Sequence, residues 1–212
     1  MVKNEMTIHE ALCEIKLLKS KIQKTVSNND YVKANKVSNS KIDGVEVDKF
    51  KDTIRKEHQS TMDLLTRLQK ISAAVSQSNS VTKITVGKDT YTVAEAIGIK
   101  NNIIPLKQYM RDDLANKLQK ASFEMNVRNK KVEEDGNQII ENSAVDKNER
   151  KNPGVALIQV RETYIEANKV ELVEGIDVRA EIKKLDDEID DFLTDLDSAL
   201  SVSNAITKIK ID

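Results

Sequence analysis

The sequence predicts a mainly α fold in which long antiparallel helices form a bundle, with a small β-hairpin sheet at one end. Two patterns predict it: apolar residues recur every three or four positions over long stretches, and short β-branched stretches flank glycine turns. Composition agrees, since hydrophobic residues make up 39% and aromatic residues only 3% of the 212 residues. Such a chain buries a long, narrow seam between helices more easily than a thick globular core.

The first helix is predicted to begin after Thr7. Thr7 and Glu10 have the spacing of a capping box, in which the threonine hydroxyl and the glutamate carboxylate each accept a hydrogen bond from a backbone N–H at the start of the helix. The helical pattern fades in the polar stretch 27–30. Before it, one apolar stripe runs through Ile8, Ala11, Leu12, Ile15, Leu18 and Ile22.

A hairpin and a second, longer helix follow. Asp43-Gly44 lies between short alternating residues in the stretch 41–47, which is typical of a β-hairpin turn. The helix is predicted to begin near Asp48 and to end near Ser78-Asn79. Its stripe consists of Phe50, Ile54, His58, Met62, Leu65, Leu68, Ser72 and Val75.

The clearest hairpin is predicted in residues 81–92, where threonine and β-branched residues alternate on both sides of Gly87. A second capping box, Thr92 with Glu95, opens the third helix. Gly98 weakens this helix, and Pro105 should kink it because proline removes one backbone hydrogen bond.

Residues 132–176 are less regular, and we interpret them as an insertion on the core. Breaks are predicted at Asp135-Gly136 and at the Asn-Pro-Gly stretch 152–154, with a short helix over 155–168. A last helix follows Asp177 and should stop at Ser203-Asn204, before a strand over 206–211. The predicted organisation is a helical core with a hairpin in residues 1–131, the insertion in residues 132–176, and a closing helix and strand in residues 177–212.

One internal repeat involves the ends of the second and last helices. Residues 78–86 match residues 203–211 at five of nine positions, and two further positions exchange Val for Ile. Asparagine tolerates the left-handed backbone conformation in which many helices end, so Asn79 and Asn204 are predicted to end their helices. We therefore expect the two strands that follow to lie side by side in one sheet, joined by the 41–47 hairpin, with Asn39 near the same end of the bundle.

The repeated residues are also the candidate binding site. The structural interpretation, helix capping followed by strand pairing, is favoured. In the functional interpretation, amide, hydroxyl and amino groups face a small anionic ligand, because such groups beside exposed backbone amides suit phosphate. No glycine-rich phosphate loop accompanies them. The candidate ligand-binding residues are Asn79, Thr82, Lys83, Asn204, Thr207 and Lys208.

No catalytic residue, metal site or cofactor is predicted. His9 and His58 lie far apart in the sequence, and His58 falls on an apolar stripe, where a core or interface role is favoured over that of a catalytic base. The single cysteine, Cys13, is interpreted as a small hydrophobic residue. No Cys/His spacing matches a zinc site, and the sequence contains no nucleophile elbow or dinucleotide-binding fingerprint.

A dense acidic run lies in the last helix. Asp187, Asp191 and Asp195 share one helix face but lack the loop and glycine of a calcium site, so a solvated acidic face is favoured over a metal site. Its complement is the basic third helix, and the two faces could pair within one subunit or between subunits. The basic residues are Lys100, Lys107, Arg111, Lys117, Lys120, Arg128, Lys130 and Lys131.

Charge and hydropathy limit the classes of partner. The formal net charge is −1, so we expect no general attraction to nucleic acid or to an anionic membrane. No apolar run approaches the ~18 residues that span a bilayer, and we see no secretion signal. A single cysteine suits a reducing compartment. The expected location is the cytoplasm, or a particle assembled there.

Several of these motifs resemble known proteins. The opening helix with Glu10-Ala11-Leu12, and the turn of residues 82–92 leading into the third helix, resemble a family of small helical bacterial proteins of unknown function, some of which carry the name septicolysin. Residues 199–207 resemble the tail of uncharacterised proteins from phages and prophages of low-GC bacteria. The resemblance covers residues 7–130 and 177–211. It implies a helical bundle with a hairpin and a phage or prophage source, and it brings no catalytic residues.

These observations predict a non-enzymatic, homo-oligomeric assembly protein: a structural or accessory component of a bacteriophage virion that contacts other copies and other virion proteins. Long amphipathic helices with few aromatic residues gain most from packing between subunits. The alternative is a phage protein that sequesters a small anionic ligand, a nucleotide signal of host defence, in a pocket between subunits. Either protein is expected in the host-cell cytoplasm or in the virion.

Overall fold

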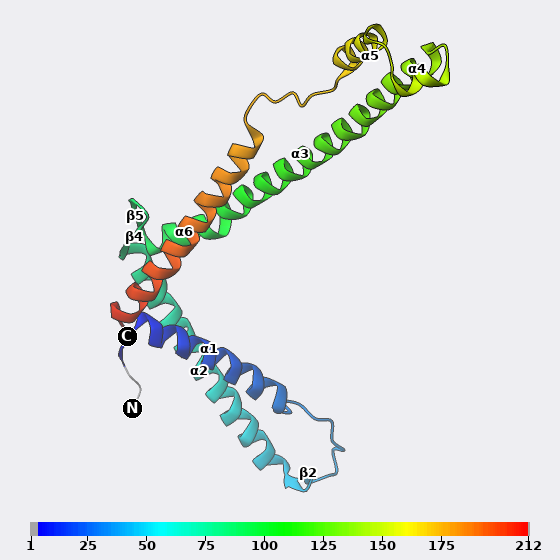
Figure 1. Ribbon diagram of the computed structural model, residues 1–212. Coiled ribbons are helices and arrows are strands. Elements are labelled where there is room, and N and C mark those ends of the chain that lie inside the picture. The colour runs from blue at the N-terminus through cyan, green and yellow to red at the C-terminus, as the bar shows by residue number, and fades with distance from the viewer. Residues whose placement is uncertain (1–3, 212) are drawn as a thin grey trace. The chain divides into compact units, whose positions relative to one another are not determined.

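The computed structural model describes residues 4–211 and is mainly α-helical with small β-hairpins, as the sequence predicts (Figure 1). The helices are α1 (Ile8–Asn28), α2 (Val47–Val81), α3 (Val93–Ser143), α4 (Lys147–Lys151), α5 (Val155–Asn168) and α6 (Val178–Ile206). The strands are β1 (Glu5–Thr7), β2 (Lys41–Ile42), β3 (Val45–Glu46), β4 (Lys83–Val86), β5 (Asp89–Thr92) and β6 (Lys208–Lys210).

The chain divides into two compact units. The terminal unit contains the described residues up to Asn101 and from Asp191 onward, and the central unit contains residues 102–190. These limits differ from the predicted segments, because residues 102–131 and 177–190 group with the predicted insertion. Helix α3 passes from one unit to the other just before Pro105, whose missing N–H removes one hydrogen bond of the helix.

In the terminal unit, α1 and α2 lie side by side and are joined at one tip by β2 and β3 (Figure 1). The predicted capping box holds the start of α1: the Glu10 amide donates to the Thr7 hydroxyl at 3.2 Å, and the Thr7 amide donates to the Glu10 carboxylate at 3.0 Å. The predicted Asp-Gly turn is also present. Asp43 and Gly44 have φ angles of 48° and 81°, the left-handed pair that a tight hairpin turn requires.

The face that α2 buries differs from the predicted one. His58, Met62 and Leu65 are exposed rather than packed in a core. The observed buried stripe of α2 and the predicted stripe share only Leu68 and Val75. The buried residues that pack against α1 recur every 3.5 residues on average, whereas the predicted stripe began on a different face of the helix. The residues of α2 that are buried or half-buried on this seam are Thr61, Leu64, Leu68, Ile71 and Val75.

Helices α2 and α6 both continue past the asparagines that were predicted to end them. The last helical residues are Val81 and Ile206, and in each case a threonine follows in place of a left-handed asparagine. Asp43 is the one non-glycine residue within 4–211 that has a positive φ. The prediction is wrong because the β-branched threonine turns the chain into the extended conformation without a left-handed residue.

The structure contains three separate two-stranded antiparallel sheets. Strand β4 pairs with β5, β6 pairs with β1, and β2 pairs with β3. The predicted single sheet, with residues 81–86 beside residues 206–211, is therefore wrong. Asn39 precedes the start of α2 whereas Asn79 lies near its end, about 48 Å along the helix axis at 1.5 Å per residue. The three predicted asparagines therefore do not gather at one end.

The second half of the terminal unit is built around β4, β5 and the adjoining ends of α3 and α6. Its buried residues are Ile84, Val86, Val93, Ala96 and Leu196, and the rings of Tyr91 and Phe192 meet edge to face with centroids 6.5 Å apart. Gly87 forms the β4–β5 turn with a φ of 61°, a conformation that glycine adopts without strain.

In the central unit, α3 continues through Asp135-Gly136, which the sequence predicted as a break. Gly136 is buried because α5 crosses α3 here, and a Cβ on Gly136 would lie 3.0 Å from the Ile165 side chain. The predicted helix over 155–168 and the break before it are confirmed. The side-chain amide of Asn129 donates to the Val170 carbonyl and accepts from the Val170 amide, which fixes the segment after α5.

Ion pairs join α3 and α6 within one subunit, so the basic and acidic helices meet in the same chain. Lys107 pairs with Glu188 at 2.6 Å and Arg111 with Asp186 at 2.8 Å in the central unit. In the terminal unit Lys100 pairs with Asp197 at 2.8 Å. Other basic residues of α3 pair within their own helix: Lys117 with Asp113, Arg128 with Glu124 and Lys130 with Glu134. Within residues 4–211, every helix is too short or too polar to cross a lipid bilayer.

Candidate functional site

The repeat found in the sequence is a repeated structure at the ends of α2 and α6. The Thr82 amide donates to the Ser78 carbonyl at 2.9 Å, and the Thr207 amide donates to the Ser203 carbonyl at the same distance. The hydroxyls of each Ser–Thr pair also lie 3.4 Å apart. Both helices therefore end through the same hydrogen bonds, with the threonine leading into a strand.

The helices that begin beside these strands are equivalent too. The Val93 amide at the start of α3 donates to the Thr82 carbonyl at 2.9 Å, and the Ile8 amide at the start of α1 donates to the Thr207 carbonyl at 2.9 Å. Each of these helices carries a Thr–Glu capping box, Thr92 with Glu95 in α3 as in α1. The equivalence thus includes both the helix that ends and the helix that begins.

The strand registers and the buried positions agree with this equivalence. Lys83 faces Thr92 as Lys208 faces Thr7, and the next positions, Ile84 and Ile209, are both buried. Ala11 and Ala96 are both fully buried in the first turns of α1 and α3. In α2 and α6 the equivalent buried residues, each seven positions before the serine that accepts the closing hydrogen bond, are Ile71 and Leu196.

The chain is therefore a tandem pair of β-α-α-β repeats. The first repeat is residues 5–86 (β1, α1, α2, β4), with β2 and β3 between its helices. The second is residues 89–211 (β5, α3, α6, β6), with α4 and α5 between its helices. In each repeat the opening strand pairs with the closing strand of the other repeat. We call the β4–β5 pairing the linked joint, because Gly87-Lys88 connect its strands, and the β6–β1 pairing the open joint.

Three of the six predicted binding residues come together at these junctions. Thr82, Lys83 and Thr207 line one hollow of about 530 Å³ between β4 and the end of α6. Asn79 instead lines a different hollow of about 430 Å³, between α1, α2 and α3. Asn204 is half-buried and Lys208 is exposed, and neither lines these two hollows.

The charges in the Thr82–Thr207 hollow are mixed. The Asp195 carboxylate also lines it, with one oxygen 3.8 Å from the Cβ position of Gly87. Lys83 lies beside Glu95, whose pKa is held below its usual value by the Thr92 amide and hydroxyl and, to a smaller extent, by the Lys83 charge. Lys83 has the Glu95 carboxylate beside it and shares the hollow with that of Asp195, so it attracts an anion less than an isolated lysine does. The geometry thus favours the structural interpretation of these residues.

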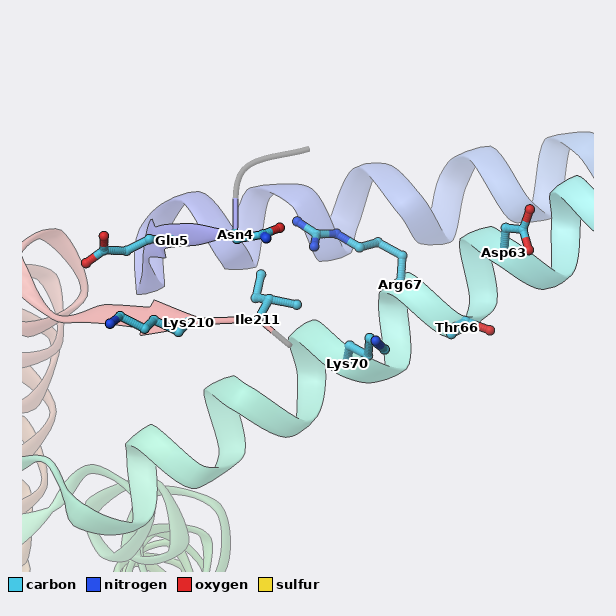
Figure 2. Close-up of a pocket in the computed structure, with 8 residues that line it drawn as sticks. All are labelled: Asn4, Glu5, Asp63, Thr66, Arg67, Lys70, Lys210 and Ile211. Atoms are coloured by element: carbon cyan, nitrogen blue, oxygen red, sulfur yellow. The ribbon is translucent and has the colours of Figure 1, made fainter. Parts of the chain in front are cut away.

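A second hollow, of about 650 Å³, lies at the open joint and was not predicted (Figure 2). Its residues come from β1, the middle of α2 and β6, three segments that no local pattern connects. Arg67 lies on its wall and binds the Glu14 carboxylate through two nitrogens, at 2.9 and 3.4 Å. The lining residues are Asn4, Glu5, Asp63, Thr66, Arg67, Lys70, Lys210 and Ile211.

The histidines and the cysteine are all on the surface. His58 is exposed, which corrects the core position, one of the two roles favoured for it, and leaves the interface role as a prediction. Cys13 is exposed, with its sulfur 3.9 Å from Nε2 of His9 on the same helix. Cys13, interpreted from the sequence as a small hydrophobic residue, is thus a free thiol on the surface of α1. Across residues 4–211, no group of three or more His, Cys, Asp or Glu side chains is arranged to hold a metal ion.

The acidic face of α6 is open to solvent. Asp187, Asp191 and Asp195 are each exposed, and none of them forms an ion pair within the described part of the chain. The solvated carboxylates repel one another weakly, and salt screens them. The junction geometry and the surface are thus the available guides to function: when the chain was compared with models of protein families, with curated proteins and with solved structures, none matched it.

Proposed function

We propose that this protein is a non-enzymatic assembly protein that works as a homo-oligomer, and that it is a structural or accessory component of a bacteriophage virion. The observation that carries the proposal is the distribution of apolar side chains. Among the described residues, the large apolar side chains that are exposed outnumber the apolar side chains that are buried.

Folding is driven mainly by the removal of apolar surface from water, and this chain removes comparatively little of it on its own. Contacts between copies would supply the missing burial.

One helix face provides apolar contacts for such an interface. On the α6 side of α3, Ile104 is buried and Lys107 and Arg111 bind carboxylates of α6. On the opposite side, four large apolar residues one helical turn apart are left without cover. They form what we call the α3 outer face: Ile103, Leu106, Tyr109 and Met110, which are 46%, 65%, 71% and 47% exposed.

The α3 outer face gains stability only when something covers it. Burial of an exposed Leu, Ile or Met side chain contributes about 1.5–3 kcal/mol each. Aromatic residues and methionine are enriched in protein interfaces, and Tyr109 and Met110 are adjacent here. We therefore assign this face to contacts with further copies or with other virion proteins.

The test is the mass of the purified protein in solution, measured by light scattering and native mass spectrometry over a range of concentrations. We expect a multimer of defined mass, or particles that grow with concentration. Leu106→Asp should shift the distribution toward monomer. Val37→Asp, at a fully exposed loop position, is the matched control and should leave it unchanged. A strict monomer at every concentration up to about millimolar would rule out the assembly function.

The virion assignment needs its own test. An antibody against the protein, used on lysates of phage-producing cells, should detect it in the particle fraction of a density gradient. Recovery only in the soluble host-cell fraction would remove the virion part of the proposal and leave homo-oligomerisation in place. We assign no catalytic residue and no cofactor.

The second candidate function is sequestration of a small anionic ligand, such as a nucleotide signal of host defence. It is supported by the meeting of Thr82, Lys83 and Thr207 in one hollow, whose volume suits a small molecule. Native mass spectrometry should then show an extra small mass, and titration calorimetry should show stoichiometric uptake of cyclic or ADP-ribose-type nucleotides. Lys83→Gln should weaken uptake, whereas Lys88→Gln, in the turn outside the hollow, should not.

A further inference from the structure

The open joint completes the core of the first repeat with a strand that belongs to the second. Met6, Ile8, Ile71 and Val75, all of the first repeat, pack with Ile209 of β6 and with its neighbour Ile211 in one buried cluster. Both of these isoleucines are 5% exposed. Without them, the seam between α1 and α2 would be open to water at this end.

Backbone hydrogen bonds fix the same strand. Thr207 accepts from the Ile8 amide, and the Ile211 amide donates to the Asn4 carbonyl at 2.9 Å. Between these bonds, Met6 faces Ile209 in the register of the sheet. Figure 2 shows the two strands side by side, with Ile211 between them and the stretch of α2 that carries Arg67 and Lys70.

The two joints differ in how their strands are connected. At the linked joint a two-residue turn, Gly87-Lys88, holds the strands together. At the open joint β1 and β6 are the first and last strands of the described chain, and no turn joins them. The contacts that β6 makes with the first repeat can therefore be made equally well by β6 of another copy.

We propose that β6 is a donor strand: in the assembled protein it leaves the first repeat of its own chain and completes the first repeat of a second copy. This inference rests on the proposed assembly function and names its contact. The chain turns from helix to strand at Thr207, so a change of backbone angles there redirects β6. Addition of a strand from one molecule to the fold of another is an established mode of recognition.

The second copy is the occupant that fits, because it offers the same groove and the same complementary charges. Glu5 faces Lys210 across the joint, so the register places opposite charges together in either arrangement. After the exchange, β6 makes with the first repeat of the next copy the contacts that it makes here within one chain, so protein concentration sets the balance between the two arrangements. Pairing within one chain has an effective concentration of about millimolar, so dilute protein stays closed. Crowded copies exchange strands and join head to tail, which builds a ring or a filament.

A disulfide across the joint tests the proposal. Glu5 and Lys210 face each other at a position without mutual backbone bonds, because the bonded pairs are the neighbouring ones; such positions bring Cα atoms to about 4.5 Å, which suits a disulfide. The variant is Glu5→Cys with Lys210→Cys, made in a Cys13→Ser background. The matched control is Thr85→Cys with Thr90→Cys in the same background, the equivalent pair of the linked joint.

Oxidation in dilute solution should lock the open joint within one chain and lower the assembled fraction about tenfold or more, with recovery on reduction. The control pair should close within the chain and leave assembly unchanged. Oxidation after assembly of mixed ¹⁴N- and ¹⁵N-labelled protein should give disulfides that join position 5 of one chain to position 210 of a differently labelled chain, as identified by mass spectrometry of the non-reduced protein.

Two results would overturn the inference, and they differ. If the reduced double-cysteine variant assembles but every disulfide formed after assembly lies within a single chain, β6 is not exchanged, and assembly uses another surface such as the α3 outer face. If the Cys13→Ser protein stays monomeric at every concentration, the proposed assembly function fails together with the donor strand.

Discussion

Replacing Ile209 or Ile84 by alanine should show that the open joint opens locally more readily than the linked joint. The two residues hold equivalent positions, in β6 and β4, and are 5% and 7% exposed. Replacement of a buried isoleucine by alanine costs about 2–5 kcal/mol, from lost transfer free energy and from the cavity left behind. We therefore expect Ile209→Ala and Ile84→Ala to lower the free energy of unfolding by similar amounts.

The local consequence should differ, because β4 is tied to β5 by Gly87-Lys88 whereas β6 is held by its contacts alone. A loss of about 2 kcal/mol in the docking of β6 raises its open population about 30-fold, since roughly 1.4 kcal/mol corresponds to a factor of ten. In Ile209→Ala, amide hydrogen exchange should therefore speed up selectively in the β1–β6 ribbon. In Ile84→Ala, exchange across β4 and β5 should follow the global stability.

The measurement is native-state hydrogen exchange by NMR, with urea unfolding curves on the same samples for the global free energy. The Ile211 amide, which donates to the Asn4 carbonyl, is the reporter for β6. If Ile84→Ala opened its hairpin as readily as Ile209→Ala opens the β1–β6 ribbon, the free energy of local opening would not depend on the Gly87-Lys88 turn. The reasoning would then be refuted.

Three further predictions concern single residues. The hydrogen bonds from Thr92 lower the pKa of Glu95 below 4.5. They therefore stabilise the fold above pH 4.5 and lose this effect as the pH falls through the lowered pKa. The urea midpoint of Glu95→Gln should thus change less than that of the wild type between neutral and acidic pH. Gly87→Ala should cost about 1–2 kcal/mol of unfolding free energy, measured by urea unfolding, because φ is 61° there. Gly136→Val should displace α5, because its Cβ would lie 3.0 Å from Ile165, and limited proteolysis should then cut near α5 while the wild type resists.

Local patterns predicted the local structure well. The capping box of Thr7 and Glu10 and the Asp43-Gly44 turn involve residues at most three positions apart, so their chemistry is complete within the pattern itself. The helix over 155–168 and the hairpin around Gly87 are confirmed for the same reason. Each of these features depends on residues that are close in the sequence and not on contacts with distant segments.

Pairing over long distances could not be predicted in this way. Strand β1 has three residues, of which one is buried, and its partner lies about 200 positions later, so neither length nor alternation marks it as a strand. In the sequence, only the closing halves of the two repeats are visibly similar. The opening halves, at Thr7 and Thr92, are 85 positions apart, whereas Ser78 and Ser203 are 125 apart, so no single offset aligns both.

The candidate site was predicted in part, for a physical reason. Thr82, Lys83 and Thr207 meet because each follows the end of a helix at an equivalent place. Asn79 and Asn204 do not join them, since both lie inside their helices and point where the helical turn directs them. Each helix continues past its asparagine and ends directly before the threonine three positions later.

The unequal lengths of the two repeats have a consequence for how such a chain can evolve. From Glu10 to Ser78 there are 68 positions, and from Glu95 to Ser203 there are 108, yet both pairs hold the same hydrogen bonds at their joints. The 40 additional positions of the second repeat therefore leave the hydrogen bonds at the joints unchanged. Mutation can lengthen, shorten or replace the central unit, residues 102–190, while selection retains the joints. Related chains would then share the framework of the joints and differ in the length of the central unit.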